Sequence, residues 1–286
     1  MITCNICKFE YDDESRTACV HCGLPANFPN VRTASRPKET SVIDNEYDDI
    51  INKVPSVIGA VLKAFEATVR NESQTVLVRP LAEVVNLFDR LNNFHQTFHQ
   101  RLRTGAVGFD GGKYDENRPS VDGKLFPRYH EEITFAALSI REAGVSGPYG
   151  KCHMVLKTPL TQHRASVFNG NSYEVLENLG AEAAKPVPNG LRTTWERRGK
   201  MAVSKFARKF TATTTDTEFP ALLNDGNNDF IEVHVFGSIS HHTIEKVGVN
   251  KAALDAYERL LASALKMKIA KWASTVPKWD TVFLEI

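Results

Sequence analysis

The segment Asp229-Phe-Ile-Glu-Val-His-Val-Phe-Gly237 is the clearest β-strand in the sequence and does most to decide the fold. Successive side chains of a strand point to opposite faces, so alternate residues share a face. One set is apolar and predicts a core-facing side: Ile231, Val233 and Val235. The other set is Phe230, Glu232, His234 and Phe236. A carboxylate and an imidazole between phenylalanines indicate a partly apolar cleft with two titratable groups. A solvated edge strand with a cross-strand salt bridge is the alternative.

The rest of the chain mixes helical and extended patterns. Helical spacing of apolar residues predicts helices within 45–104 and at 129–143, 193–210 and 251–272. Alternating patterns predict further strands at 152–156, 164–168 and 281–286. Helices first, followed by strands and helices in turn, predict an α+β protein.

A second group of candidate binding residues precedes this strand in the chain. Glycines flank Tyr149 and permit close approach of a ligand to the backbone. Arg164 offers a planar donor fork for a diphosphate, and Ser166 or Ser172 offers a hydroxyl for a ribose. Each residue also has a purely structural explanation, as part of a turn or as a surface side chain.

Taken in order, these segments resemble a known family. They read Tyr-Gly-x-x-x-x-Val-Leu-Lys at 149–157, Arg-Ala-x-x-Phe-x-Gly-x-Ser at 164–172 and Phe-Ile-Glu-Val-x-Val-x-Gly at 230–237. This pattern looks like the core of bacterial ADP-ribosyltransferase toxins, and most like those that modify nucleic acid in toxin–antitoxin and anti-phage systems. The resemblance covers roughly residues 130–250. It implies a split, two-sheet core that clasps NAD between its sheets.

The resemblance also implies roles for individual residues. Glu232 matches the catalytic glutamate, which would hold a ribose hydroxyl and stabilise positive charge at the anomeric carbon. Ser166 and Ser172 both match the serine position, and Tyr149 would stack on the leaving nicotinamide. Arg164 is the candidate for the NAD-holding arginine, although it begins the second strand. His234 would accept a proton from the acceptor or fix the glutamate.

The resemblance departs from the family at two positions. The first strand offers His153 and Lys157 where the family has its arginine. Phe230 stands where relatives that modify protein arginines have Glu or Gln. The second departure argues against a protein-arginine target and leaves nucleobases or other acceptors open.

Two cysteine pairs near the start of the chain predict a metal site. Cys4 and Cys7, then Cys19 and Cys22, each stand two residues apart within their pair. Four thiolates close a tetrahedral Zn²⁺ site with no position left for water, so the predicted zinc is structural. Disulfides or redox motifs are the alternative, and His21 is not needed as a ligand.

Composition along the chain predicts how it divides into domains and which kinds of partner it can bind. We expect a zinc ribbon at 1–25, a polar linker at 26–44, a helical region at 45–128 and an α+β catalytic domain at 129–286. The net charge is +1, so any nucleic-acid surface must be local. No apolar run has the length of a membrane span and no signal peptide is recognisable, which favours no membrane partner and a reducing cytoplasm.

One local basic surface is predicted at 193–210. Its cations are Arg197, Arg198, Lys200, Lys205, Arg208 and Lys209, interleaved with Trp195, Phe206 and Phe210. Such a mixture suits phosphate contact with base stacking, although a solvated amphipathic helix looks the same.

The histidines outside the strand are expected to be structural. His95 and His99 stand four residues apart and are expected on a polar helix face. His241 and His242 begin a short helix capped by Ser240 or Thr243.

Three functions are compatible with these patterns. The leading one is an NAD-dependent ADP-ribosyltransferase toxin that modifies nucleic acid, RNA by preference, and is held in check by an antitoxin protein. The second is a nuclease that uses Glu232 and His234. The third is a non-enzymatic zinc-ribbon adaptor for nucleic acid or protein.

Overall fold

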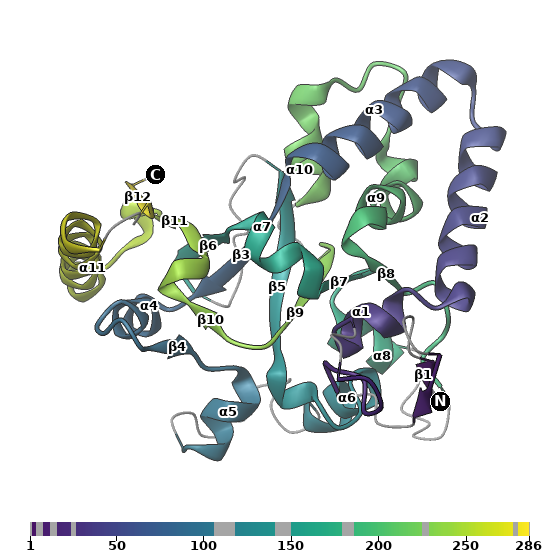
Figure 1. Ribbon diagram of the computed structural model, residues 1–286. Helices are drawn as coiled ribbons and strands as arrows, with labels where there is room; N and C mark the ends of the chain where they lie inside the picture. The colour runs from purple at the N-terminus through teal and green to yellow at the C-terminus, as the bar shows by residue number, and fades with distance from the viewer. Residues whose placement is uncertain are drawn as a thin grey trace.

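The structure is a computed structural model of the 286-residue chain (Figure 1). It describes residues 2–3, 8–11, 16–23, 27–105, 118–140, 150–178, 186–224, 229–276 and 280–285, with only the backbone of residues 2, 3 and 11. Across these residues the protein is a mixed α/β structure built on one large mixed sheet.

The large sheet has eight strands in the order β12-β11-β6-β3-β5-β9-β7-β8. Neighbouring strands are antiparallel, except for the parallel pair β11 and β12. The strands are β3 (Ser73–Arg79), β5 (Ile133–Ile140), β6 (Cys152–Leu156), β7 (Ala165–Phe168), β8 (Arg192–Thr194), β9 (Glu232–Phe236), β11 (Ile244–Val249) and β12 (Val282–Glu285). Predicted strands at 152–156, 164–168, 230–236 and 281–286 are confirmed within one or two residues at each end.

The predicted two-sheet split is wrong for the described residues, because β6, β7 and β9 belong to one sheet. Two strands that were not predicted from the sequence, β3 and β5, lie between β6 and β9 and join them. All eight residues of β5 are buried. A strand covered on both faces has no alternation, so its continuous apolar run was mistaken for the helix 129–143.

Eleven α-helices surround this sheet in the described part of the chain (Figure 1). They are α1 (Pro29–Ala34), α2 (Pro37–Lys53), α3 (Ser56–Glu72), α4 (Leu81–Leu87), α5 (Phe98–Arg103), α6 (Arg118–Leu125), α7 (Thr158–Thr161), α8 (Ser172–Asn178), α9 (Arg198–Phe206), α10 (Phe219–Leu223) and α11 (Ala256–Thr275). Two small sheets pair β1 (Ile2–Thr3) with β2 (Glu10–Tyr11), and β4 (Phe94–His95) with β10 (Ile239–Ser240).

The predicted linker at 26–44 is wrong over most of its length, because it contains α1 and the first half of α2. Pro29 and Pro37 are the first residues of these helices, where a missing N–H costs nothing and the fixed φ suits a helix. Ile43 is fully buried in the main core. The prolines therefore start helices, although among the polar residues of 26–44 they suggest an extended linker.

The predicted separation of a helical region from the catalytic domain also fails. Strand β3 lies in the middle of the sheet although it belongs to the region 45–128. Within the predicted helical stretch 45–104, the apolar residues at helical spacing between 81 and 98 do not form one helix: α4 ends at Leu87, and the chain then forms β4 before α5 begins at a capping box of Thr97 and Gln100.

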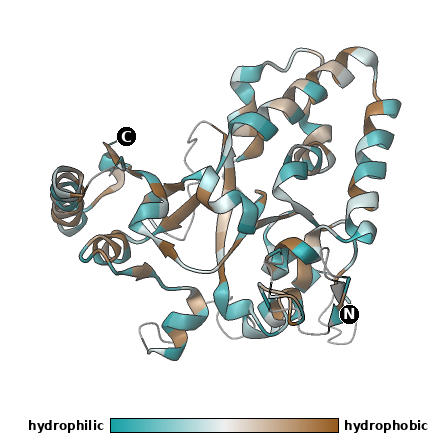
Figure 2. Cartoon of the chain, in the orientation of Figure 1, coloured by the Kyte–Doolittle hydropathy of each residue, from teal (hydrophilic) through white to brown (hydrophobic). Residues whose placement is uncertain are grey.

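The two faces of the sheet are covered differently. The face bearing Leu77, Met154 and Val233 packs against α3, α9 and α4 in the main core, and the strands of the sheet centre are largely brown in Figure 2. On the other face, a smaller cluster from α6 and α8 covers Phe135 and Phe168. Val76, Val78 and Val155 form a separate cluster. Two separate groups of side chains therefore lie on this second face of the sheet, and the candidate site lies on the same face. No helix in the described ranges is both long and apolar enough to traverse a bilayer.

Candidate active site

Glu232 lies on the second face of the sheet beside small side chains. In β9 it pairs with Ala137 of β5, which in turn pairs with Val76 of β3. Side chains in register across neighbouring strands share a face of the sheet. Because Ala137 and Val76 are short, the surface next to the Glu232 carboxylate is hollowed. The prediction that Glu232 and His234 face away from Ile231, Val233 and Val235 is confirmed, since the latter three are in the main core.

This hollow forms a cavity of about 270 Å³, near the lower end of the range for small-molecule sites. Strands β3 and β5 form its floor, and α5 with the start of α6 forms its walls. The polar and aromatic side chains that line it are Arg79, Glu83, Gln96, Thr97, Phe98, Arg101, Arg118, Thr134, Phe135, Phe230 and Glu232.

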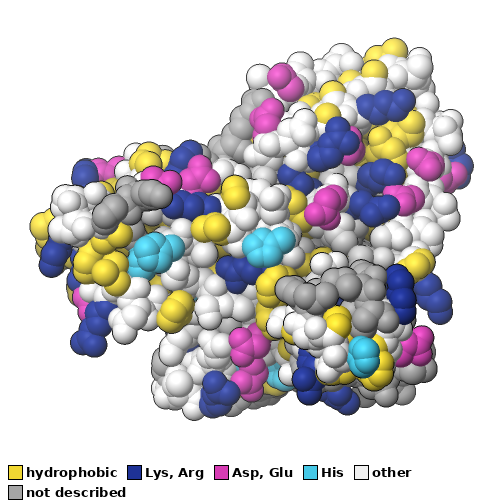
Figure 3. Space-filling view, viewed as in Figure 1, with side chains coloured by type: hydrophobic (Ala, Val, Ile, Leu, Met, Phe, Trp, Pro, Cys, Tyr) yellow, Lys and Arg dark blue, Asp and Glu magenta, His cyan; other side chains and the backbone are white. Residues whose placement is uncertain are grey.

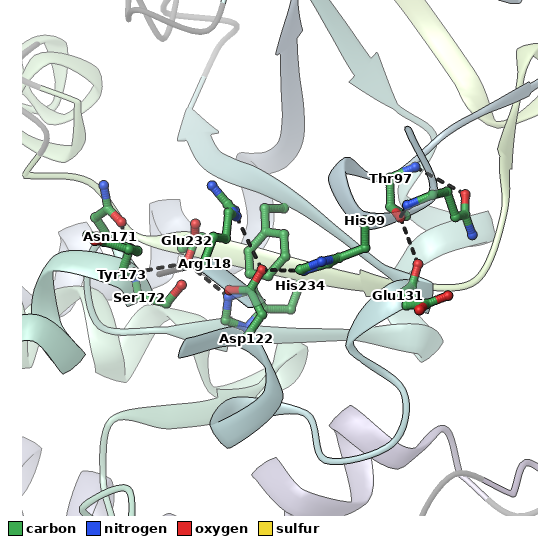
Figure 4. A network of polar contacts seen from close by, with 12 residues as sticks. Thr97, His99, Arg118, Asp122, Glu131, Asn171, Ser172, Tyr173, Glu232 and His234 are labelled. Atoms are coloured by element: carbon green, nitrogen blue, oxygen red, sulfur yellow. Dashed lines mark hydrogen bonds and ion pairs between the residues drawn. The ribbon is translucent and has the colours of Figure 1, made fainter. Parts of the chain in front are cut away.

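The Glu232 carboxylate is fixed through one of its two oxygens (Figure 4). The backbone N–H of Ser172 donates to Oε2 at 3.0 Å, and His234 Nε2 lies 3.0 Å from the same atom. Within the described residues no hydrogen bond reaches Oε1. Glu232 is 6% exposed and lines the cavity, so Oε1 is left for a ligand there.

His234 is enclosed by aromatic rings and is only 1% exposed. Its ring centroid lies 4.8 Å from that of Phe126, 5.1 Å from Phe135 and 5.7 Å from Phe168. His234 does not line the cavity. The packing fixes the imidazole plane, and the imidazole in turn orients the carboxylate of Glu232.

Three arginines reach the cavity from separate elements. Arg79 Nη1 donates to the Val78 carbonyl at 2.6 Å, and its Nη2 donates to the Phe135 carbonyl at 3.4 Å. Arg101 pairs with Glu83. Arg118 stacks over the Phe135 ring, with Cζ 4.5 Å from the centroid. Guanidinium groups beside aromatic rings suit a ligand that carries both phosphate and a flat ring.

Arg118 is held by a chain of buried polar groups (Figure 4). Its Nε donates to Asp122 Oδ2 at 3.2 Å, and His99 Nε2 lies 2.7 Å from the same oxygen. The rings of His130 and His99 are nearly perpendicular with centroids 4.7 Å apart, and burial together with His99 lowers the pKa of His130. The expectation that His95 and His99 share a polar helix face is wrong, because His95 is in β4, His99 is in α5 and both are buried.

The predicted binding residues do not all meet at this cavity. Ser172 reaches Glu232 through its backbone N–H. Arg164 instead donates to the carbonyls of Leu160 and Phe236, at 3.2 and 2.6 Å. The Ser166 hydroxyl accepts a hydrogen bond from the Asn30 side chain at 3.3 Å. Neither Arg164 nor Ser166 is among the described residues that line the cavity. Tyr149 lies outside the described residues.

The basic stretch 193–210 is not an open nucleic-acid surface. Its three aromatic residues, Trp195, Phe206 and Phe210, are buried in the main core, which contradicts the expected base stacking. Its cations are largely paired within the protein, through Lys200 and Arg197 with Asp44 and through Lys205 and Lys209 with Asp229. Figure 3 shows blue and magenta side chains interleaved over α2 and α9.

Of the four cysteines predicted to bind zinc, the structure describes Cys19 and Cys22. Cys4 and Cys7 lie outside the described residues. In the second pair, the N–H of His21 donates to Cys19 Sγ at 3.4 Å, and Gly23 has a φ of 68° and donates to the Cys19 carbonyl at 2.9 Å. His21 stacks on Phe9. The described residues alone contain no group of three or more metal-ligand side chains. A turn that directs an N–H to a cysteine sulfur suits a thiolate ligand, but the described residues do not support a zinc ribbon, and the zinc site stays a prediction.

Comparison with known protein families and with curated proteins finds no match to this chain. The site therefore stands on its own geometry. Arg79, Arg101 and Arg118, which come from β3, α5 and α6, were not predicted from the sequence as site residues. Arg79 ends a buried strand, and this position is only a weak indication in the sequence of a site residue. No sequence pattern indicated Arg101 or Arg118.

Proposed function

We propose that the protein is an NAD-dependent ADP-ribosyltransferase that acts on nucleic acid. The observation that carries the proposal is the Glu232 carboxylate, which is anchored through Oε2 and has Oε1 beside a cavity lined by arginines and phenylalanines. A dinucleotide presents the matching groups: hydroxyls for the carboxylate, phosphates for the guanidinium groups and a flat ring for the aromatic side chains.

In this proposal Glu232 acts on the bond between nicotinamide and the ribose C1′. Oε1 accepts a hydrogen bond from a ribose hydroxyl and stabilises the positive charge that develops at C1′ as the bond breaks. The bonding electron pair leaves with the nicotinamide nitrogen, which becomes neutral. A lone pair of the acceptor then forms the new bond to C1′, and the acceptor proton passes to the Glu232 carboxylate or to water.

The test is turnover of labelled NAD in the presence of RNA. Glu232→Gln keeps the side-chain volume but removes the charge, so we expect transfer to fall by about 100-fold or more. The matched control is Glu245→Gln in β11, which removes a carboxylate from the same sheet outside the cavity and should leave transfer unchanged. RNA or DNA cleavage in NAD-free buffer that depends on Glu232 would instead identify a nuclease.

His234 is proposed as a positioning residue, because it contacts Glu232 and does not line the cavity. His234→Gln loosens the carboxylate while leaving the three arginines in place. We therefore expect kcat to fall while KM for NAD changes by less than about threefold, since ground-state binding is mostly unaffected. An equal loss in kcat and affinity would show that the substitution disturbs the whole cavity.

We also propose that Cys4, Cys7, Cys19 and Cys22 together hold one structural Zn²⁺. The Cys19–Gly23 turn supports this proposal through its N–H to sulfur bond. Metal analysis of the purified protein should give one zinc per chain, and Cys19→Ser should remove it. Cys152→Ser is the control, because that thiol is buried in β6 and burial raises its pKa to about 12. Zinc retained in Cys19→Ser would contradict the proposed ligand set.

A further inference from the structure

A second cavity, of about 510 Å³, opens between α1, α2 and α6. Besides Thr33, Asn189 and apolar side chains it is lined by four cations and one carboxylate: Arg36, Lys38, Lys124, Arg192 and Glu39. We call it the basic cleft. It contains none of the residues that line the cavity beside Glu232.

The single carboxylate of the basic cleft is already satisfied. Glu39 is buried, its Oε1 lies 3.0 Å from Arg192 Nε, and its Oε2 accepts the N–H of Gly190 at 2.6 Å. Lys38 is exposed and Lys124 is half-buried. Neither lysine forms an ion pair with any described residue, unlike most cations of 193–210. Positive charge is therefore in excess here, although the whole chain carries only +1.

Helix α6 connects the basic cleft to the candidate active site. Arg118 at its first residue lines the cavity beside Glu232, and Lys124 and Leu125 at its end line the cleft. At 1.5 Å per residue the two ends are about 10 Å apart along the helix axis. A strand of nucleic acid in the cleft would thus lie within a few nucleotides of the Glu232 carboxylate.

The lining of the cleft fits a phosphodiester backbone. Two mobile ammonium groups supply contacts to phosphates. The rings of Pro127, Pro186 and Pro188 and the side chain of Val187 supply apolar surface for sugars and base faces. We propose that the basic cleft binds the backbone of the single-stranded nucleic acid that accepts ADP-ribose. That the bound strand is the acceptor of ADP-ribose rests on the proposed function, but the binding of a strand in the cleft does not.

The experiment is fluorescence anisotropy with a labelled single strand of about ten nucleotides, between about 50 and 200 mM salt. Loss of two phosphate contacts in Lys38→Ala/Lys124→Ala should weaken binding about tenfold at the higher salt, and the slope of log K against log salt should fall in magnitude by about 1.4. The matched control is Lys63→Ala/Lys271→Ala, which removes two exposed lysines of α3 and α11 and should bind as the wild type does. Far-UV circular dichroism confirms that each variant is folded.

The outcomes separate this inference from the proposed function. Glu232→Gln should bind the strand normally while losing NAD turnover, and the cleft variant should keep NAD hydrolysis to water while losing transfer. RNA and DNA probes in parallel tell which backbone is preferred. The inference is overturned if the wild type binds neither strand, if both lysine pairs weaken binding equally, or if a polyaspartate of equal charge competes as well as RNA.

Discussion

Two buried histidines outside the candidate site are kept neutral by their surroundings. Burial, followed by Arg79 and Arg101, lowers the pKa of His95 well below 6.5. Burial, followed by His242 and Lys157, lowers the pKa of His241 to about 4. In the unfolded chain both imidazoles take up a proton near pH 6.5. The unfolded state therefore binds more protons below that pH, and the free energy of unfolding falls as the pH falls.

His241 should account for a measurable part of this acid sensitivity. With a folded pKa of about 4, it lowers the free energy of unfolding by about 2 kcal/mol between pH 7 and pH 5. In His241→Gln, urea unfolding should give free energies of unfolding at pH 7 and pH 5 whose difference is smaller by that amount than in the wild type. His163→Gln, at an exposed histidine, should leave the difference unchanged. If the free energy of unfolding of His241→Gln fell as far between pH 7 and pH 5 as that of the wild type, His241 would not be a source of the acid sensitivity.

At the two ends of the segment 198–208, two cations of the same basic stretch have opposite structural roles. Arg198 is buried and donates to Ser73 Oγ at 2.7 Å and to the Trp195 carbonyl at 2.8 Å. Its guanidinium also lies 4.1 Å from the Trp195 ring centroid. Arg208, just beyond the helix, is exposed and forms no hydrogen bond or ion pair with the described residues.

This difference predicts different effects on stability. Arg198→Ala removes the side-chain donor from the buried Ser73 hydroxyl and from the Trp195 carbonyl, together with the cation–π contact, so we expect the free energy of unfolding to fall by about 3 kcal/mol. Arg208→Ala should change it by no more than about 0.5 kcal/mol. Chemical denaturation of the two variants measures both values. Equal effects would mean that the stretch acts through its total charge and that individual contacts matter little.

The elements that the sequence predicted include strands buried along almost their whole length, such as β9, whose two faces differ in polarity, and a short helix with a clear cap. Strand β9 alternates because its faces differ, and the capping box of Ser240 and Thr243 is present at the 3-10 helix His241–Thr243 as expected. Strand β5 was missed because burial on both sides removes the alternation. The helix expected to run through β4 shows the opposite error, since apolar spacing there reflects separate short elements that pack on one core.

At the scale of the whole molecule, the candidate site combines residues that are far apart in the sequence. Glu232 and its bond to the Ser172 backbone unite two motifs that the sequence had already marked. Arg79 and Arg118 reach the same cavity because β3 lies beside β5 and because Phe126, directly after α6, packs against His234. No local pattern marks such residues, since their role depends on the order of strands in the sheet. The order of strands depends on β3 and β5, which no sequence pattern predicted.

A sheet that spans the described chain from β12 to β8 predicts one cooperative unit. The expected domain division would place β3 in a separate helical region, but β3 is hydrogen-bonded to β5 and β6. Neither part can lose its strands without opening the other, so unfolding should be a single transition. Trp195 reports on the core at α9, near β8, whereas far-UV circular dichroism reports on all helices and strands.

The measurement uses a variant in which Trp272 and Trp279 are replaced by Phe, so that Trp195 is the sole tryptophan of the three. Urea unfolding followed by fluorescence and by circular dichroism should give the same midpoint, and the same free energy within about 15%. Because Trp272 donates to the Phe88 carbonyl at 2.9 Å, the substitution lowers overall stability by about 1 kcal/mol but shifts both probes together. Two separate midpoints, with Trp195 changing apart from the bulk of the secondary structure, would show that the sheet divides between two units after all.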